Sequence, residues 1–194
     1  MKPIIICIAT ALFFVSCESR VSIKPTGASF GFFIAKMNGK PWTKIGKKGG
    51  QATRGVKMNV DTTLCQDKYY VITSELYNGK DNFVQYIFFE KFPLVPGKYE
   101  LTSKLSDSCN ITNQIRASFN TIVETDIIGD QYKILANEDN YLQIEKYDPK
   151  SKEIRGSFQA TFVFENAGYR HTLPDTMRFT DGQFFTKMMD LRRK

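Results

Sequence analysis

The sequence predicts an all-β fold, an antiparallel β-sandwich with little helix. Apolar and polar residues alternate with a period of two along several segments, and turn-forming pairs separate those segments. No stretch combines an apolar stripe of 3.6-residue spacing with helix caps. The spacing of short strands does not determine their order, so a lipocalin-like β-barrel is the alternative architecture.

The first half of the chain supplies the expected strands 30–37, 56–60, 69–77, 83–92 and 98–101. These segments are rich in aromatic and β-branched residues, which pack well on a pleated surface. Segment 83–92 (FVQYIFFEKF) has apolar groups on both faces, which predicts a central strand. Asn78-Gly79 precedes it, and this pair is a strong hairpin signal because both residues tolerate positive φ.

The second half supplies 114–123, 131–135, 141–147, 154–165 and 177–187. Alternation is plainest in 154–165, where Ile154, Phe158 and Phe162 share one face and Arg155 lies on the other. Pro96-Gly97, residues 148–152 and Leu173-Pro174-Asp175 have the composition of turns. Gly156 and Gly182 are expected at bulges or bends.

The N-terminus is predicted to be a lipoprotein leader. Lys2 precedes an uncharged run, residues 3–16, that is shorter than the about 20 residues that span a bilayer and suits a signal-peptide core. The run ends in Val15-Ser16 before Cys17, which looks like a bacterial lipobox. We therefore expect residues 1–16 to be removed and Cys17 to be acylated, with more than one acyl chain giving stable membrane attachment. Residues 17–29 form a tether, and 30–190 a single β-rich domain.

Export determines which cysteines remain in the mature protein and whether they are expected to be oxidised. Cys7 leaves with the leader and Cys17 carries the lipid, so Cys65 and Cys109 remain in an oxidising compartment. A disulfide between these two residues is expected, and two separately packed, reduced thiols are the alternative.

Positive charge is concentrated in one segment. The chain has Lys+Arg 27 and Asp+Glu 20, and residues 36–60 contain seven bases and no acid. An exported protein does not meet nucleic acid, but it does meet lipid phosphates and acidic glycans. The sequence thus nominates Lys44, Lys47, Lys48 and Arg54 for contact with an anionic surface; a solvated basic loop is the alternative.

The sequence gives little sign of catalysis. One His excludes the common two-His metal sites, and G-x-S-x-G and phosphate-binding loops are absent. His171 is expected to be a solvated loop residue, and the acids Asp126, Glu138 and Asp139 to lie in solvated turns. Trp42, after the Asn38-Gly39 turn, is expected to seal the core rather than serve as a sugar platform. We therefore expect no catalytic residues, no metal and no cofactor.

Four motifs carry a resemblance, and they lie in residues 33–42 (FIAKMNGKPW), 142–148 (LQIEKYD), 154–158 (IRGSF) and 179–184 (FTDGQF). Together they resemble a family of Gram-negative lipoproteins of unknown function, in which a lipobox leader precedes a β-rich domain with an A-x-(I/M)-N-G-x-x-W opening and an I-x-G-x-F … T-x-G-x-F closing. The resemblance implies an exported, anchored β-domain without established catalytic residues.

The expected function is that of a non-enzymatic binding or structural module of the cell envelope. It would be membrane-anchored, with the outer membrane favoured over the inner, and periplasmic or surface-exposed. The first alternative is an immunity or inhibitor lipoprotein that neutralises an envelope-acting toxin or hydrolase. A hydrolase is the second.

Overall fold

The protein is all-β, as the sequence predicts. A computed structural model describes residues 30–43, 48–62, 65–104, 114–123, 127–169 and 171–190, with backbone alone for 59–62 and 65–68. Within these ranges there is no helix, and hence none long and apolar enough to cross a membrane. The strands are β1 (Phe32–Met37), β2 (Lys40–Pro41), β3 (Gly50–Thr62), β4 (Cys65–Tyr77), β5 (Phe83–Glu90), β6 (Gly97–Thr102), β7 (Gln114–Val123), β8 (Ile127–Ile134), β9 (Tyr141–Asp148), β10 (Glu153–Ala167) and β11 (Thr176–Asp190).

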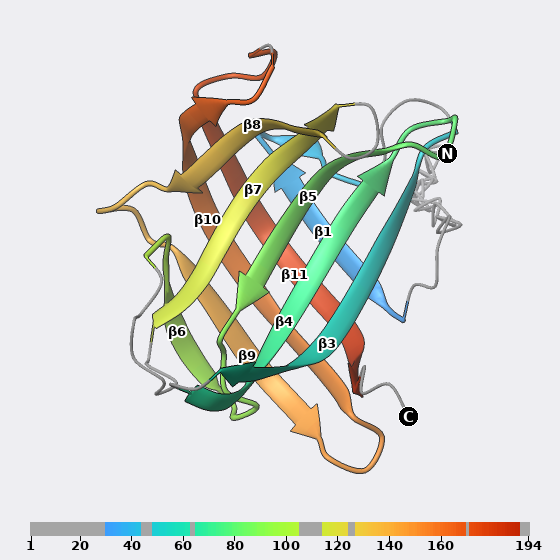
Figure 1. Cartoon of the computed structure of the whole chain (residues 1–194), viewed down its shortest axis with the longest axis vertical. Helices are drawn as coiled ribbons and strands as arrows, with labels where there is room; N and C mark the ends of the chain where they lie inside the picture. The colour runs from blue at the N-terminus through green and yellow to red at the C-terminus, as the bar shows by residue number, and fades with distance from the viewer. Residues whose placement is uncertain are drawn as a thin grey trace, which may run out of the picture.

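The strands form a sandwich-like arrangement of two layers (Figure 1). The front layer runs β3-β4-β5-β7 and the back layer β1-β11-β10-β9, each through antiparallel pairs. β6 bonds to β7 and β9, β8 bonds to β7 and β10, and β11 bonds to β3, so the layers are continuous at both sides. This continuity encloses one core between the layers.

The sheet is mixed rather than wholly antiparallel, because β3 pairs with β11 and β6 pairs with β7 in parallel. Parallel neighbours cannot be joined by a tight turn and need a longer connection. β3 and β11 lie far apart in the chain, and residues 103–113 separate β6 from β7. Local alternation carries no information on such pairs.

Several elements differ from the sequence prediction: β4 begins at Cys65 instead of residue 69, and β8 at Ile127 instead of residue 131. β3 begins at Gly50 instead of residue 56. The pattern did not indicate its first residues, because the inward side chains there, Gln51 and Thr53, are polar although they are buried. The two-residue strand β2 was not predicted. It forms because Asn38 and Gly39 have φ values of 50° and 77°, which make the predicted tight turn and pair Met37 with Lys40.

The glycine of β10 behaves as predicted. The register between β10 and β9 shifts between Arg155 and Gly156. A Cβ at Gly156 would lie 2.0 Å from the backbone oxygen of Gln143, so no larger residue fits without moving β9.

Trp42 lies in the core, with 2% of its surface exposed. Its ring meets Phe33 of β1 and Phe179 of β11 edge-on, with centroids 5.7 and 5.3 Å apart. Its indole Nε1–H donates to Oε1 of Gln85 on β5 at 2.9 Å. Buried indoles require such a partner, so the predicted role as a core plug is confirmed.

Trp42→Phe is expected to lower the free energy of unfolding, because Oε1 of Gln85 would be left buried without its donor. That loss alone corresponds to about 1–3 kcal/mol. Urea unfolding measures it. Tyr169→Phe, at a residue that is 79% exposed, is the control and should change stability by less than about 0.5 kcal/mol. Equal effects of the two variants would contradict the assigned role of the indole.

Candidate functional site

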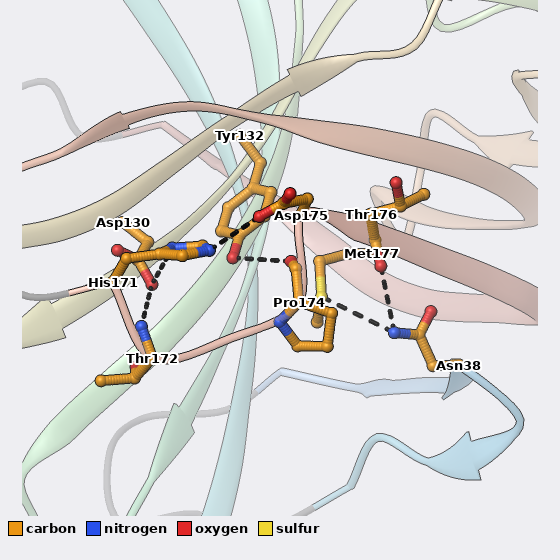
Figure 2. Close-up of polar contacts among 9 residues, drawn as sticks. All are labelled: Asn38, Asp130, Tyr132, His171, Thr172, Pro174, Asp175, Thr176 and Met177. Carbon is orange, nitrogen blue, oxygen red and sulfur yellow. Dashed lines mark hydrogen bonds and ion pairs between the residues drawn. The ribbon is translucent and has the colours of Figure 1, made fainter.

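His171 is the centre of a polar cluster where the loop between β10 and β11 crosses β8 (Figure 2). Its Nδ1 lies 3.3 Å from Oδ2 of Asp130, and its Nε2 lies 3.0 Å from Oδ1 of Asp175. The ring also packs on Phe164, with centroids 4.1 Å apart. The sequence correctly placed this residue in an exposed loop, but it did not predict the two carboxylates that pair with its ring.

Asp130 is the buried partner of this pair, and its side chain has no solvent exposure. Oδ2 also accepts the backbone N–H of Thr172 at 3.2 Å, while Oδ1 has no hydrogen-bond partner among the described residues. A buried carboxylate is unfavourable unless a cation and donors compensate it. The imidazolium of His171 provides this compensation, and it thereby attaches the loop to β8.

A backbone contact holds the same loop close to the sheet. The N–H of Gly168 donates to the carbonyl of Gly129 at 2.8 Å. A Cβ at Gly168 would lie 1.9 Å from the backbone oxygen of Ile128. The loop thus leaves β10 in direct contact with the backbone of β8.

Tyr132 and Asn38 extend the polar contacts along this end of the molecule (Figure 2). The Tyr132 hydroxyl donates to the carbonyl of Pro174 at 3.1 Å. Burial raises the pKa of Tyr132, and the charges of Asp130 and Asp175 raise it further, so the hydroxyl keeps its proton. Asn38 Nδ2 donates to the carbonyl of Thr176 at 3.1 Å, which joins the β1–β2 turn to β11.

The protonation of His171 decides what the cluster can do chemically. Burial lowers the pKa of His171, but the hydrogen bonds and charges of Asp175 and Asp130 outweigh burial, so the pKa lies above its ordinary value of 6.5. The protonated ring has a carboxylate at each nitrogen and no lone pair to accept a proton. In that protonated state the cluster holds the loop to β8 and offers no base.

Asp130 was missed in the sequence. A signal was present, because alternation places Asp130 on the same face as Tyr132 and Ile134, both inward. An acid at an inward position requires a compensating partner nearby, but alternation along β8 does not show which base supplies it.

The acids noted in turns are paired with bases rather than with each other. Glu138 bonds to Arg178 at 3.1 Å and Asp139 to Lys98 at 3.3 Å. Asp126 lies outside the described residues. Within the part of the chain that the structure describes, no group of three or more His, Cys, Asp or Glu side chains is arranged to hold a metal ion.

The nominated anion contacts are only partly described. Arg54 on β3 forms an ion pair with Glu75 on β4, which also accepts the Tyr77 hydroxyl at 2.6 Å. The charge of Arg54 is therefore matched within the sheet, and this residue does not supply an unmatched cation. Lys48 packs beside Gly79, whose Cβ position lies 3.0 Å from Cβ of Lys48.

Four other nominated residues lie outside what the structure describes. These are Lys44, Lys47, Cys17 and Cys109. Cys65 begins β4, but its side chain is also outside the description. The lipid anchor, the disulfide and the anionic contact of the two lysines stay predictions.

A hollow of about 380 Å³ lies between β6, the end of β8 and the turn after it. Its wall includes Ser103, whose hydroxyl accepts the N–H of Ile134, and Asn140, whose Nδ2 donates to the carbonyl of Leu135 at 2.8 Å. Small-molecule sites are mostly apolar with a few unengaged polar groups. Here those two polar side chains already bond to the backbone, which favours a structural role for them.

A second candidate is a line of rings on the outer side of the front layer. Tyr77, Phe83, Tyr86 and Phe88 follow one another with centroids 5.8, 5.5 and 6.0 Å apart. Arg116 of β7 lies over Phe88 at 5.5 Å. We name these five residues the aromatic face. They are half-buried although no strand covers them in the described structure, because each side chain lies against the next.

The aromatic face carries balanced charge. Arg116 bonds to Glu90 on β5 at 2.6 Å, and Glu75 beside Tyr77 pairs with Arg54. Burial raises the pKa of Tyr86, so its hydroxyl is neutral. The aromatic face is therefore rich in aromatic groups, and Glu90 beside it matches the charge of Arg116.

His171→Gln is expected to destabilise the protein more at pH 5.5 than at pH 9. The folded pKa of His171 is raised, so the folded state holds more protons than the unfolded state between the two pKa values. The stabilisation is fully present below the unfolded value, about 6.5, and is lost as the pH rises through the folded value. Urea unfolding of both proteins across this range measures it, and a difference that does not change with pH would refute the clamp.

Comparison with known protein families, with curated proteins and with solved structures finds no match to this chain. The resemblance to Gram-negative lipoproteins of unknown function thus rests on the quoted motifs and stays a prediction.

Proposed function

We propose that this chain is an exported lipoprotein, anchored through Cys17, whose β-domain is a non-enzymatic binding module of the cell envelope. The leader and the Val15-Ser16-Cys17 sequence support the anchor. The aromatic face is the observation that supports binding. The partner in this proposal is a protein.

The non-enzymatic part rests on how reactive groups are used. His171 has a carboxylate at each ring nitrogen, and Glu138 and Asp139 are each paired with a base. These groups already have intramolecular partners that hold loops and turns in place. Their arrangement stabilises the domain without presenting an acid and a base to a substrate.

The binding part rests on the composition of the aromatic face. Cores of protein interfaces are enriched in aromatic residues and Arg, and energetic hot spots in Tyr, Trp and Arg. Tyr86, Phe88 and Arg116 are held by neighbours on a sheet, so little side-chain entropy is lost on binding. The paired charges favour a partner surface without strong net charge, which fits a protein better than a polyanion.

Cys17→Ser is expected to abolish acyl labelling and to release the protein from membranes. The substituted residue has no thiol to form the thioether with diacylglycerol. Metabolic labelling with a fatty acid and membrane fractionation measure the two effects. Cys7→Ser is the matched control, because this residue lies within the leader and should leave both unchanged. Acyl labelling that persists in Cys17→Ser would show the anchor assignment to be wrong.

A photocrosslinking amino acid at Tyr86 is expected to capture an envelope protein in cells, whereas the same group at Gln183 is not. Gln183 is exposed on β11, in the opposite layer. Phe88→Ser should weaken capture at position 86 by about 30-fold, the effect of losing about 2 kcal/mol at a hot spot. Urea unfolding must show that Phe88→Ser is folded. Capture that is absent at position 86, or equal at both positions, would refute the proposed face.

A further inference from the structure

Strand β1 has apolar side chains on both of its faces. Phe33 and Ala35 point into the core and are buried. Phe30, Phe32 and Ile34 point outward and are 39%, 45% and 48% exposed. A strand whose outer face met only water would carry polar residues at these positions. The outer face of β1 therefore has a surface role that its packing does not explain.

The neighbouring strand limits this apolar area. Phe32 stacks on Phe185 of β11, with ring centroids 6.0 Å apart. The exposed positions on either side of Phe185 along β11 are polar, Gln183 and Lys187. We name Phe30, Phe32, Ile34 and Phe185 the β1 patch. It lies at the start of the described domain, on the back layer.

The charges around the β1 patch are paired. Lys36 bonds to Asp181 at 2.8 Å and Lys187 to Glu153 at 3.4 Å. Arg155, which lies opposite Phe185 across the β10–β11 pair, is 3.9 Å from Glu145. The local charge therefore favours neither an anionic nor a cationic partner. Any contact made by this patch must come from burial of apolar surface.

The chain itself suggests what covers the β1 patch. Twelve residues, 18–29, separate Cys17 from Phe30, and fully extended they reach at most about 45 Å. An acylated Cys17 would therefore keep the β1 patch within that distance of a bilayer. Such tethering makes a second, weak contact effectively intramolecular, with a local concentration in the millimolar range.

A second copy of the chain fits this patch less well. A stable dimer buries about 800 Å² on each partner. Four side chains, one of them already half-buried, are too few to supply this area. A membrane contact that is assisted by a covalent anchor needs much less surface, because the anchor provides the affinity.

We propose that the β1 patch lies on the lipid bilayer and inserts Phe32 and Ile34 among the lipid chains, which fixes the orientation of the anchored domain. This inference rests on the lipid anchor of the proposed function. The contact is apolar, so it is insensitive to salt. It thereby differs from the predicted anionic contact of Lys44 and Lys47, which salt would screen.

The test uses the mature protein, acylated at Cys17, in phosphatidylcholine vesicles that contain brominated lipid. Phe32→Trp places a fluorophore in the patch without removing its apolar character. We expect its emission to shift to the blue and to be quenched by bromine, equally in 0.1 and 1 M NaCl. Trp42 is buried in the core, so the unsubstituted protein provides the baseline.

Tyr169→Trp is the matched control, because it is an exposed aromatic in the loop between β10 and β11 and should not be quenched beyond the baseline. Ile34→Ser added to Phe32→Trp should reduce the quenching, and urea unfolding checks that both variants fold. Vesicle flotation separates the two proposals. A Phe32→Trp protein that floats without quenching of its introduced indole overturns the membrane contact and leaves the anchor. A protein that does not float overturns both.

Discussion

Trp42 joins the two layers, and the rest of the fold depends on this contact. Its backbone N–H donates to the carbonyl of Ala35 on β1 at 2.8 Å, and its carbonyl accepts Nε2 of Gln51 on β3 at 3.4 Å. Its indole bonds to Gln85 on β5. One residue thus links a strand of the back layer to two strands of the front layer. Because this occurs inside the core, each polar group of the link must be satisfied, which explains the buried glutamines.

At the β10–β11 loop, the buried polar group is an acid rather than an amide. Asp130 brings a charge into the interior, and the loop must supply His171 to compensate it. The pair attaches the loop to β8, because leaving the buried carboxylate of Asp130 unpaired would be unfavourable. The single His of the chain is thus one of several contacts that hold this loop against the sheet. Both nitrogens of its ring face a carboxylate within this cluster.

The sequence predicts most strands because their inward residues are apolar and their outward residues polar. It fails where this rule fails. The start of β3 has Gln51 and Thr53 inward, and the outward face of β1 has Phe32 and Ile34. The parallel partners of β3 and β6 depend on contacts between distant parts of the chain, which no local period records.

The candidate sites likewise divide into residues that the local sequence predicts and contacts that depend on the pairing of distant strands. Trp42 as a core residue was predictable, since a single large aromatic beside a tight turn favours burial. The ion pair of Arg54 with Glu75 was not, because it depends on the register of β3 and β4. The aromatic face likewise requires β4, β5 and β7 to be in register, so that rings from separate segments meet.

The β1 patch and the aromatic face lie on opposite sides of the domain. Their orientations relative to a membrane are therefore linked. Phe33 of β1 stacks inward on Phe89 of β5, with centroids 6.1 Å apart. Successive side chains on a strand alternate between its faces, so Phe32 and Phe88, the preceding residue on each strand, both point away from the core. One lies on the back layer and the other on the front. A domain that rests on a bilayer through the β1 patch therefore presents its aromatic face away from the membrane, where a partner can reach it.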